Sequence, residues 1–306
     1  YGTMRDNVLA LTAVLPSGDV VRTSRRARKS SAGYDLTRLL VGSEGTLAVI
    51  TEVTLRLYGL PEEIAAAVCP FTSLEGAVQT VIETIQLGIP VARIELLDPL
   101  QIEASNSYSH LDLQVAPTLF LEFHGTAAAV EEQSRQVRAL AEVNGSLSWR
   151  ATTDSEERNH LWAARHDAYY ADLAVRPGVS GMPTDVCVPI SRLADVISET
   201  RRDLDDSGIW SPIVGHVGDG NFHLIFLLDP DDPDDVARHR RAHDRLVRRA
   251  LDAGGTCTGE HGIGYGKLEY MVEEHGPALV AAMAAIKHAI DPLGIMNPGK
   301  VVPEAI

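Results

Sequence analysis

Short apolar runs alternate with longer amphipathic segments along most of this 306-residue chain. The runs are typical of strands with buried faces, and apolar residues at every third or fourth position are typical of helices. The order of these elements indicates an α+β fold in which helices cover one face of a sheet. We predict strands at 8–15, 20–23, 47–50, 52–57, 65–69, 92–97, 118–123, 146–150 and 184–188, and helices at 73–87, 127–142, 154–174, 192–206, 236–253 and 277–290.

The most informative pattern is a pair of apolar runs, 209–217 and 222–228, on either side of Asp219-Gly220. Asp-Gly favours a two-residue type I′ hairpin turn, because both central positions take positive φ. With the turn at these residues, His216 lies opposite His223, with the Cβ atoms about 4.5–5.5 Å apart. Two such imidazoles can bind one metal ion, although paired histidines are also common as ordinary polar residues of a half-buried face.

A second candidate segment, 254–267, is rich in glycine and contains Gly259-Glu260-His261-Gly262. Glycine is used where the backbone takes positive φ or approaches another group closely, and a flexible surface loop has a similar composition. Glu260 offers a third metal ligand, and in an extended backbone His261 points to the opposite face. A metal would lower the pKa of a bound hydroxyl, and His261 could then remove its proton as a general base.

Two further side chains are candidates for holding a substrate. Asn221, beside the turn, can donate a hydrogen bond to a substrate oxygen, or it serves the turn alone. Arg165 shares the predicted helix 154–174 with Trp162. Its guanidinium can bind a carboxylate through two hydrogen bonds, or it is an ordinary surface arginine.

Composition narrows the classes of function. The net charge of −15 and the lack of a basic run argue against nucleic acids and anionic membranes as partners. No apolar run approaches the roughly 18 residues of a membrane span, and no signal peptide is evident. The three cysteines are far apart, which excludes a disulfide framework and fits a reducing compartment. Abundant alanine and arginine are typical of a GC-rich bacterial source, so we expect a bacterial cytoplasmic protein, at most peripheral to the inner membrane.

Several motifs, in this order, resemble the FAD-linked 2-hydroxy-acid dehydrogenases, which belong to the vanillyl-alcohol-oxidase type of flavoprotein. The segments that carry the resemblance are 31–36, 41–47, 216–223, 259–262 and 297–300. Two more segments, Trp162-Ala163-Ala164-Arg165-His166 and 183–189, are most similar to the cytochrome-linked D-lactate dehydrogenase branch. The FAD subunit of glycolate oxidase is similar as well, and the resemblance covers essentially the whole chain.

This resemblance implies a domain organisation. Residues 1–59 would be the C-terminal part of a PCMH-type FAD-binding domain. Residues 60–285 would form a ferredoxin-like antiparallel-sheet cap domain that holds substrate and metal, and residues 286–306 would return to the FAD domain. Members of the family carry a long segment before the position of Tyr1, so we expect a fragment that holds FAD weakly and is inactive alone.

The resemblance also implies the roles of individual residues. His216, His223 and Glu260 would ligate zinc or manganese. Arg165 would hold the substrate carboxylate, Asn221 would orient the substrate, and His261 would take the hydroxyl proton while the C2 hydride passes to the flavin. The residues that would line the FAD are Gly42, Gly45, Thr46, Ile50 and Asn297.

The implied reaction is the oxidation of a D-2-hydroxy acid, with D-lactate to pyruvate as the first candidate. No lysine lies around Thr184, where the 2-hydroxyglutarate branch uses one. Glycolate and D-2-hydroxyglutarate remain alternative substrates, and a metal-dependent hydrolase or a non-catalytic subunit remain alternative functions. The reaction needs an electron acceptor, which could be a cytochrome, a quinone or an electron-transfer flavoprotein. The oligomeric state, a homodimer included, stays open.

Overall fold

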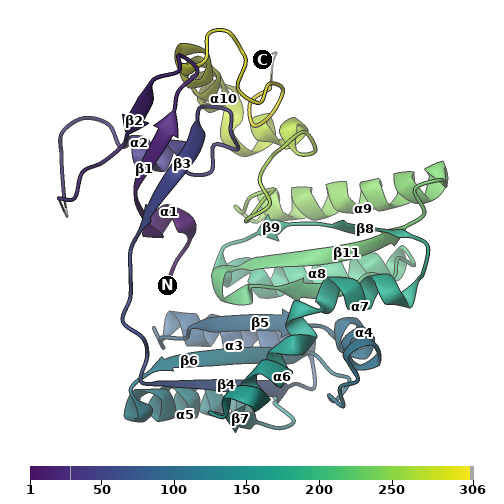
Figure 1. Ribbon diagram of the computed structural model, residues 1–306. Coiled ribbons are helices and arrows are strands. Elements are labelled where there is room, and N and C mark those ends of the chain that lie inside the picture. Colours follow the sequence, from purple (N-terminus) through teal and green to yellow (C-terminus); the bar gives the residue numbers. More distant parts are fainter. Residues whose placement is uncertain (28, 304–306) are drawn as a thin grey trace. The chain divides into compact units, whose positions relative to one another are not determined.

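The computed structural model describes residues 1–27 and 29–303 (Figure 1). By compactness the chain divides into two units. The first unit consists of Tyr1–Gly59 and Glu260–Ile306, and the second consists of Leu60–Gly259. We predicted domain bounds after residues 59 and 285, whereas the compact units change after residues 59 and 259.

The first unit is built on a small antiparallel sheet in which β1 lies between β2 and β3. A core cluster that includes Leu11, Leu40 and Leu47 contacts Ile290 at the end of the last helix. This contact explains why the C-terminal helix groups with the N-terminal strands. The elements of this unit are α1 (Met4–Asn7), β1 (Val8–Val14), β2 (Val20–Arg22), α2 (Leu36–Leu40), β3 (Val49–Leu55), η3 (Leu268–Tyr270) and α10 (Met271–Ile290).

The second unit is an eight-stranded antiparallel sheet with helices on both faces (Figure 1). Its strand order is β7 (Arg150–Thr152), β4 (Glu63–Pro70), β6 (Thr118–Gly125), β5 (Arg93–Leu97), β10 (Ile213–Gly215), β11 (Asn221–Leu228) and β8 (Ser180–Pro183), and β9 (Val186–Cys187) also pairs with β11. Its helices are α3 (Leu74–Gln86), α4 (Pro99–Ser109), α5 (Ala127–Val143), α6 (Ser155–His166), α7 (Ala168–Val175), η1 (Ile190–Arg192), α8 (Leu193–Asp206), η2 (Val217–Asp219) and α9 (Pro233–Asp252).

The predicted α+β class is confirmed, but the prediction that helices cover only one face was wrong. Every residue of β11 is buried, so this strand is covered on both sides. Ile225 packs in a cluster with Trp162 of α6, whereas the neighbouring Phe226 contacts His239 of α9 with ring centroids 5.3 Å apart. Because side chains alternate along a strand, His223 faces the same side as Ile225, towards α6.

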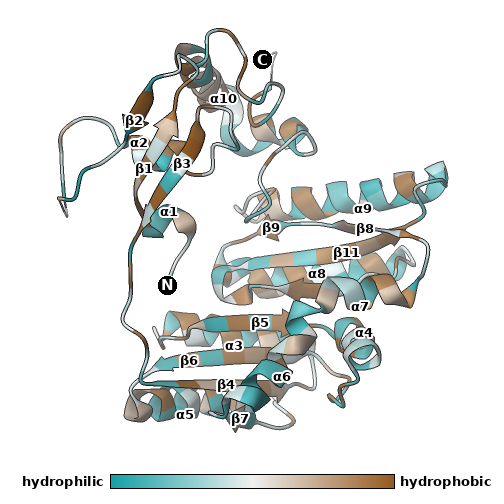
Figure 2. Cartoon of the chain, in the orientation of Figure 1, coloured by the Kyte–Doolittle hydropathy of each residue, from teal (hydrophilic) through white to brown (hydrophobic). Residues whose placement is uncertain are grey.

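Helix α9, predicted at 236–253, is rich in arginine. Figure 2 shows this helix as mainly hydrophilic, with apolar residues confined to bands along it. Ala242, Leu246 and Ala250 are buried at helical spacing. Arg245 and Arg248 are exposed, whereas Arg249 is largely buried and pairs with Asp203 of α8 at 3.0 Å. Among the described residues, no helix is both long enough and apolar enough to cross a membrane.

The hairpin of β10 and β11 forms, but its register differs from the predicted one. Val214, and not His216, lies opposite His223. The 3₁₀ turn η2 and Gly220, at φ +80°, make the connection longer than two residues. A Cβ at Gly220 would lie 2.1 Å from the carbonyl oxygen of Val188. The turn is therefore shaped by the chain that it packs against, which Asp-Gly alone does not reveal.

The predicted helix 154–174 is in fact two helices, α6 and α7, with the break at Asp167. The Asp167 carboxylate accepts a hydrogen bond from the Ser109 hydroxyl of α4 at 3.1 Å. Helix α4 was not predicted, because its sequence mixes apolar and polar residues without a continuous apolar stripe.

Candidate functional site

The two histidines that the sequence pairs do lie together in the second unit. The ring centroids of His216 and His223 are 5.7 Å apart, with the rings edge to face. His223 lies on β11 and is buried, whereas His216 follows β10 and has a partly exposed side chain. The prediction of their proximity is therefore confirmed, although the register behind it was wrong.

The ring of His216 is held at both nitrogens. Nδ1 lies 2.6 Å from Oε1 of Glu95, and Nε2 lies 3.3 Å from Nη2 of Arg165. An ionised carboxylate only accepts hydrogen bonds, and a guanidinium only donates them. We therefore assign a neutral ring with its proton on Nδ1 and its lone pair on Nε2.

The ring of His223 is likewise held at Nδ1. Nδ1 lies 2.9 Å from the backbone carbonyl oxygen of Thr184, which can only accept. The Thr184 hydroxyl in turn accepts a hydrogen bond from the backbone N–H of Leu224 at 2.8 Å. Thr184 thus fixes the ring of His223 from the adjoining strand with a proton on Nδ1, which leaves Nε2 as the nitrogen that would face a metal.

This pair fits a divalent metal ion. A histidine that binds a metal through one nitrogen usually donates its other N–H to a carboxylate or a backbone carbonyl, which fixes the tautomer. His216 donates to the first kind of partner and His223 to the second. The donor set therefore suits zinc or manganese, provided that another ligand completes the site.

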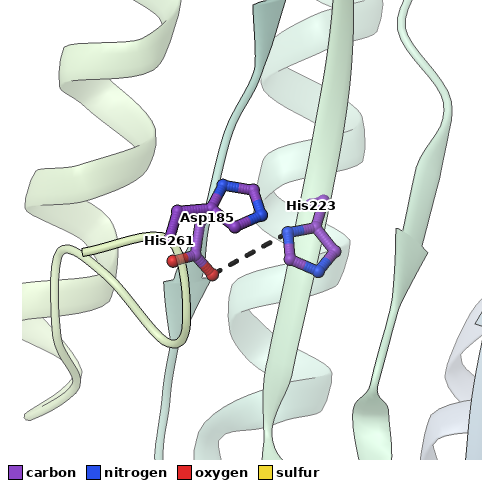
Figure 3. A group of neighbouring side chains, drawn as sticks. All are labelled: Asp185, His223 and His261. Atoms are coloured by element: carbon purple, nitrogen blue, oxygen red, sulfur yellow. Dashed lines mark ion pairs between the residues drawn. The ribbon is translucent and has the colours of Figure 1, made fainter. Parts of the chain in front are cut away.

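Asp185 is a buried carboxylate beside this pair that our sequence analysis missed. Its Oδ1 lies 3.8 Å from Nδ1 of His223 (Figure 3). Oδ1 also accepts from Asn221 at 2.7 Å, and Oδ2 accepts from the Thr258 hydroxyl at 2.7 Å. His261, also drawn in Figure 3, belongs to the first unit. An acidic residue inside the predicted strand 184–188 is the signal that could have identified Asp185.

Asn221 makes contacts within the second unit. Its Nδ2 donates to Asp185 Oδ1 at 2.7 Å and to the carbonyl oxygen of Val186 at 2.8 Å. Both amide hydrogens are therefore engaged, and none is left to donate to a substrate oxygen. Asn221 instead fastens Asp185 and β9 to β11.

Glu260 follows a segment that is fixed to the second unit. Thr256 and Cys187 form an antiparallel bridge, and a Cβ at Gly259 would lie 2.1 Å from Nδ2 of Asn221. Glu260 is the next residue, and consecutive Cα atoms are about 3.8 Å apart. Chain connectivity thus keeps the Glu260 backbone next to a residue that packs on Asn221.

Glu260 and His261 are close to each other within the first unit. Oε1 of Glu260 lies 3.7 Å from Nε2 of His261, and both side chains are about half exposed. Our expectation of opposite directions was wrong, because the backbone here is a bend and not an extended strand.

Arg165 is not an ordinary surface arginine, because Glu95 of β5 holds it. Nε of Arg165 donates to Oε2 of Glu95 at 2.8 Å, and only 19% of the arginine side chain and 6% of the glutamate side chain are exposed. Two of the five N–H donors of the guanidinium are used in these contacts, which leaves three for a ligand. Our sequence analysis missed Glu95; its signal is a charged residue inside an apolar strand.

The first unit brings the glycine loop and the Asn297 turn, both predicted to line FAD, together with the segment at Ile263 and Gly264. The Glu44 carboxylate accepts from the backbone N–H groups of Ile263 at 2.7 Å and Gly264 at 2.9 Å. Nδ2 of Asn297 donates to the carbonyl oxygen of Glu44. Gly45 has φ +71°, and its Cβ position would be 3.9 Å from the Asn297 side chain. The predicted turn of the C-terminal segment thus lies against the predicted glycine loop.

The other residues predicted to line FAD are placed as follows. Gly42 has φ +81°, a conformation that glycine adopts readily. The buried Thr46 donates its hydroxyl to the Ser43 carbonyl oxygen at 2.7 Å, and its own carbonyl oxygen accepts from Lys287 at 2.7 Å. Ile50 lies on β3 and is 39% exposed. The hydroxyl, the backbone N–H and the carbonyl oxygen of Thr46 are thus all engaged within the chain.

The chain is similar to known proteins over nearly its full length. The C-terminal domain of FAD linked oxidases matches residues 60–301. A probable mitochondrial D-lactate dehydrogenase of Danio rerio is 52% identical over 99% of this chain and 61% of the relative. A mitochondrial D-lactate dehydrogenase [cytochrome] of Arabidopsis thaliana is 46% identical over 99% of this chain and 53% of the relative. The chain thus spans about half to three fifths of these curated relatives.

Solved structures support the fold. The 4-ethylphenol oxidase from Gulosibacter chungangensis, in complex with isoeugenol, superimposes with a TM-score of 0.73 over 97% of this chain and 66% of that chain. The sequence identity is 17%, so this similarity concerns the fold alone. It supports the fold that the sequence predicts.

The predicted bacterial cytoplasmic location is wrong. The relatives from Danio rerio and Arabidopsis thaliana are mitochondrial proteins. Cysteines without a disulfide framework indicate only a reducing compartment. An excess of arginine over lysine does not indicate a subcellular location.

Proposed function

The chain belongs to the FAD-linked oxidases, whose C-terminal domain accounts for residues 60–301, and on this premise we propose that it contributes the substrate and metal site of a D-2-hydroxy-acid dehydrogenase. The first candidate substrate is D-lactate, which would be oxidised to pyruvate with FAD as the electron acceptor. The observation that carries the proposal is the histidine pair, in which Nδ1 of each ring is engaged with an acceptor, so that Nε2 is the nitrogen that would bind a metal.

The proposed metal ligands are His216, His223 and Glu260. The two histidines already have the tautomer that metal binding requires, and chain connectivity keeps Glu260 next to Gly259, which packs on Asn221. Zinc or manganese held there would supply a positive charge that lowers the pKa of a bound 2-hydroxyl group.

The remaining residues bind the substrate and move its proton. Arg165 offers three N–H donors and a fixed positive charge to the carboxylate, in the planar geometry that carboxylates match. His261 follows Glu260 directly and is only partly buried. Its imidazole is proposed to accept the hydroxyl proton near neutral pH.

The first unit is proposed to provide part of the FAD site. The loop Gly42 to Thr46, the segment at Gly264 and the turn at Asn297 are hydrogen-bonded to one another through Glu44. FAD held there would supply the hydride acceptor for the oxidation of the substrate at C2. The loop residues contribute backbone groups that approach a flat ring closely, since glycine carries no Cβ.

The choice of D-lactate rests on the names of the relatives and on the small number of basic residues at the site. Arg165 can hold one carboxylate, and the residues around Thr184 include no lysine for a second. Glycolate and D-2-hydroxyglutarate are the competing substrates. Family membership argues against the hydrolase alternative, because hydrolysis needs no flavin. A cytochrome is the proposed acceptor of electrons from the reduced flavin, as in the name of the Arabidopsis relative.

Anaerobic reduction of the flavin tests this function. This chain would be extended at its N-terminus with the corresponding segment of the Danio rerio relative, loaded with FAD, and mixed in turn with D-lactate, L-lactate, glycolate and D-2-hydroxyglutarate. We expect rapid bleaching of the flavin absorbance by D-lactate and slow or no bleaching by the other three. Equal bleaching by both lactate enantiomers, or bleaching by none of the four acids, would refute the proposal.

A further inference from the structure

We infer that Glu95 is a positioning residue that fixes His216 and Arg165 in one arrangement. This inference rests on the proposed function, in which His216 binds the metal and Arg165 binds the substrate carboxylate. It assigns a task to a buried carboxylate that touches neither substrate nor metal.

The geometry divides the Glu95 carboxylate between the two partners. Oε1 lies 2.6 Å from Nδ1 of His216, and Oε2 lies 2.8 Å from Nε of Arg165. Glu95 is 6% exposed, so water competes little for these bonds. A buried carboxylate is costly unless it is paired and hydrogen-bonded, and these two contacts supply the compensation.

The contact with His216 determines which nitrogen can bind a metal. Because the carboxylate can only accept, it holds the ring proton on Nδ1 and leaves the lone pair on Nε2. A neutral partner would hold the same tautomer less strongly, since hydrogen bonds to charged groups are stronger.

The contact with Arg165 gives the second half of the task. Nη2 of Arg165 now donates to the same Nε2 lone pair that a metal would occupy, at 3.3 Å. When this lone pair is taken by a metal, the Nη2 donor becomes available to a substrate carboxylate. The Nε bond to Glu95 then keeps the guanidinium in place. Metal binding at His216 and substrate binding at Arg165 would thus be coupled.

Glu122 on the neighbouring strand β6 provides a matched control. It is also 6% exposed and also lies between an arginine and a histidine: Arg93 Nη2 at 3.0 Å and His124 Nε2 at 2.7 Å. His124 is not among the proposed metal ligands. Replacing Glu122 therefore removes the same kind of buried charge pair without altering His216.

The test is a titration of the metal-free chain with Zn²⁺ in competition with a chromophoric chelator, for the wild type, Glu95→Gln, Glu122→Gln and His216→Ala. We expect Glu95→Gln to weaken zinc binding by roughly 10- to 100-fold, as for other partners of metal-binding histidines. Glu122→Gln is expected to bind zinc as the wild type does, and thermal unfolding of each variant checks its fold.

The outcomes separate this inference from the proposed function. If His216→Ala binds zinc weakly while Glu95→Gln binds it as tightly as the wild type, the inference is overturned and the proposed function stands. An equal loss in Glu95→Gln and Glu122→Gln also overturns the inference, because any buried charge pair would then matter. A wild-type chain that binds neither Zn²⁺ nor, in the same competition titration, Mn²⁺ overturns both.

A measurement on the unmodified protein covers the case in which Glu95→Gln does not fold. Nitrogen-15 spectra of the histidine rings in the metal-free wild type, above neutral pH, report the tautomer of His216. We expect the proton on Nδ1. A proton on Nε2 would contradict the inference, because Glu95 would then not be the acceptor.

Discussion

At the scale of single residues, the second unit contains two fully buried carboxyl groups that share one glutamine. Asp98 Oδ1 accepts from the backbone N–H of Gln101 at 2.9 Å, and Asp172 Oδ1 accepts from Nε2 of Gln101 at 3.1 Å. Burial and then the negative charge of Asp98 raise the pKa of Asp172 to about 8. Burial raises the pKa of Asp98 to about 6, while the Gln101 N–H and Arg201 act to lower it. Asp172 is therefore mostly protonated at neutral pH.

Protonated Asp172 makes the stability of the protein depend on pH. Its pKa is about 8 when folded and near 3.8 when unfolded, so the folded state binds one more proton between these values. Its contribution to stability is thus greatest in acid and is lost as the pH rises towards 8, by about 1.4 kcal/mol per pH unit. We expect Asp172→Asn to remove this slope between pH 6 and pH 7.5, a window above the pKa of Asp98. Urea unfolding of both proteins across the window is the measurement.

The control for this variant is the exposed Asp112→Asn. It should leave the pH dependence of unfolding as in the wild type. Asparagine at 172 can still accept from Gln101 Nε2, and its own N–H can reach Oε1 of Gln101, which has no hydrogen-bond partner among the described residues. Identical slopes for wild type and Asp172→Asn would show that Asp172 is ionised in the folded state.

At the scale of elements, the loop Gly42 to Thr46 is held by the side chain of Glu44. Two backbone N–H groups, those of Ile263 and Gly264, donate to its carboxylate. These residues follow His261 closely, so Glu44 also orders the segment that carries the proposed base. Glu44 has φ +53°, and the neighbouring Gly42 and Gly45 have positive φ as well, which allows the tight turn.

Removing the Glu44 side chain should loosen this segment. In Glu44→Ala we expect the amide hydrogens of Ile263 and Gly264 to exchange roughly tenfold to hundredfold faster, since hydrogen bonds to charged groups contribute about 1.5–3 kcal/mol. Hydrogen exchange followed by NMR measures this. The exposed Glu269→Gln, in the same unit, should leave both amides as protected as in the wild type. Unchanged protection in Glu44→Ala would mean that other contacts order the segment.

The elements also show which structural features the sequence patterns predict and which they do not. The Asp-Gly pair correctly brings His216 near His223, but η2 lengthens the turn, because Gly220 packs against Val188. Helical spacing correctly places Trp162 and Arg165 on one helix, but the break at Asp167 depends on Ser109, which is distant in sequence. Local periodicity carries no information on such tertiary contacts.

In the candidate site too, sequence patterns identify residues but not their tertiary contacts. The histidines and Arg165 are identifiable by residue type and motif. Glu95 and Asp185 were missed because their importance arises from strand pairing and from partners far along the chain. The contacts of Asn221 with Asp185 and with the Val186 carbonyl oxygen arise from strand pairing in the same way.

At the scale of the whole molecule, the second unit is complete in its secondary structure. All strands of its sheet and the cluster around Trp162 lie within Leu60–Gly259. We expect a chain of residues 60–259 to fold alone, because no strand of the sheet comes from elsewhere. Far-UV circular dichroism and urea unfolding should show regular secondary structure and one cooperative transition.

The isolated unit also lacks Glu260, the proposed third metal ligand. It should bind Zn²⁺ about tenfold or more weakly than the 306-residue chain, although His216 and His223 remain in place. A disordered spectrum would show that the first unit is needed for folding. A folded unit with undiminished zinc affinity would exclude Glu260 as a ligand.

The central claim is that a metal held by His216, His223 and Glu260 is needed to oxidise a D-2-hydroxy acid at the flavin. The most direct measurement is anaerobic flavin reduction by D-lactate, in the extended FAD-loaded chain, before chelation, after chelation and after restoring Zn²⁺ or Mn²⁺. We predict rapid reduction that is lost on chelation, returns with metal, and stays absent in His216→Ala at all metal concentrations that restore the wild type. Rapid reduction that persists in the chelated protein, at full rate, would contradict the account.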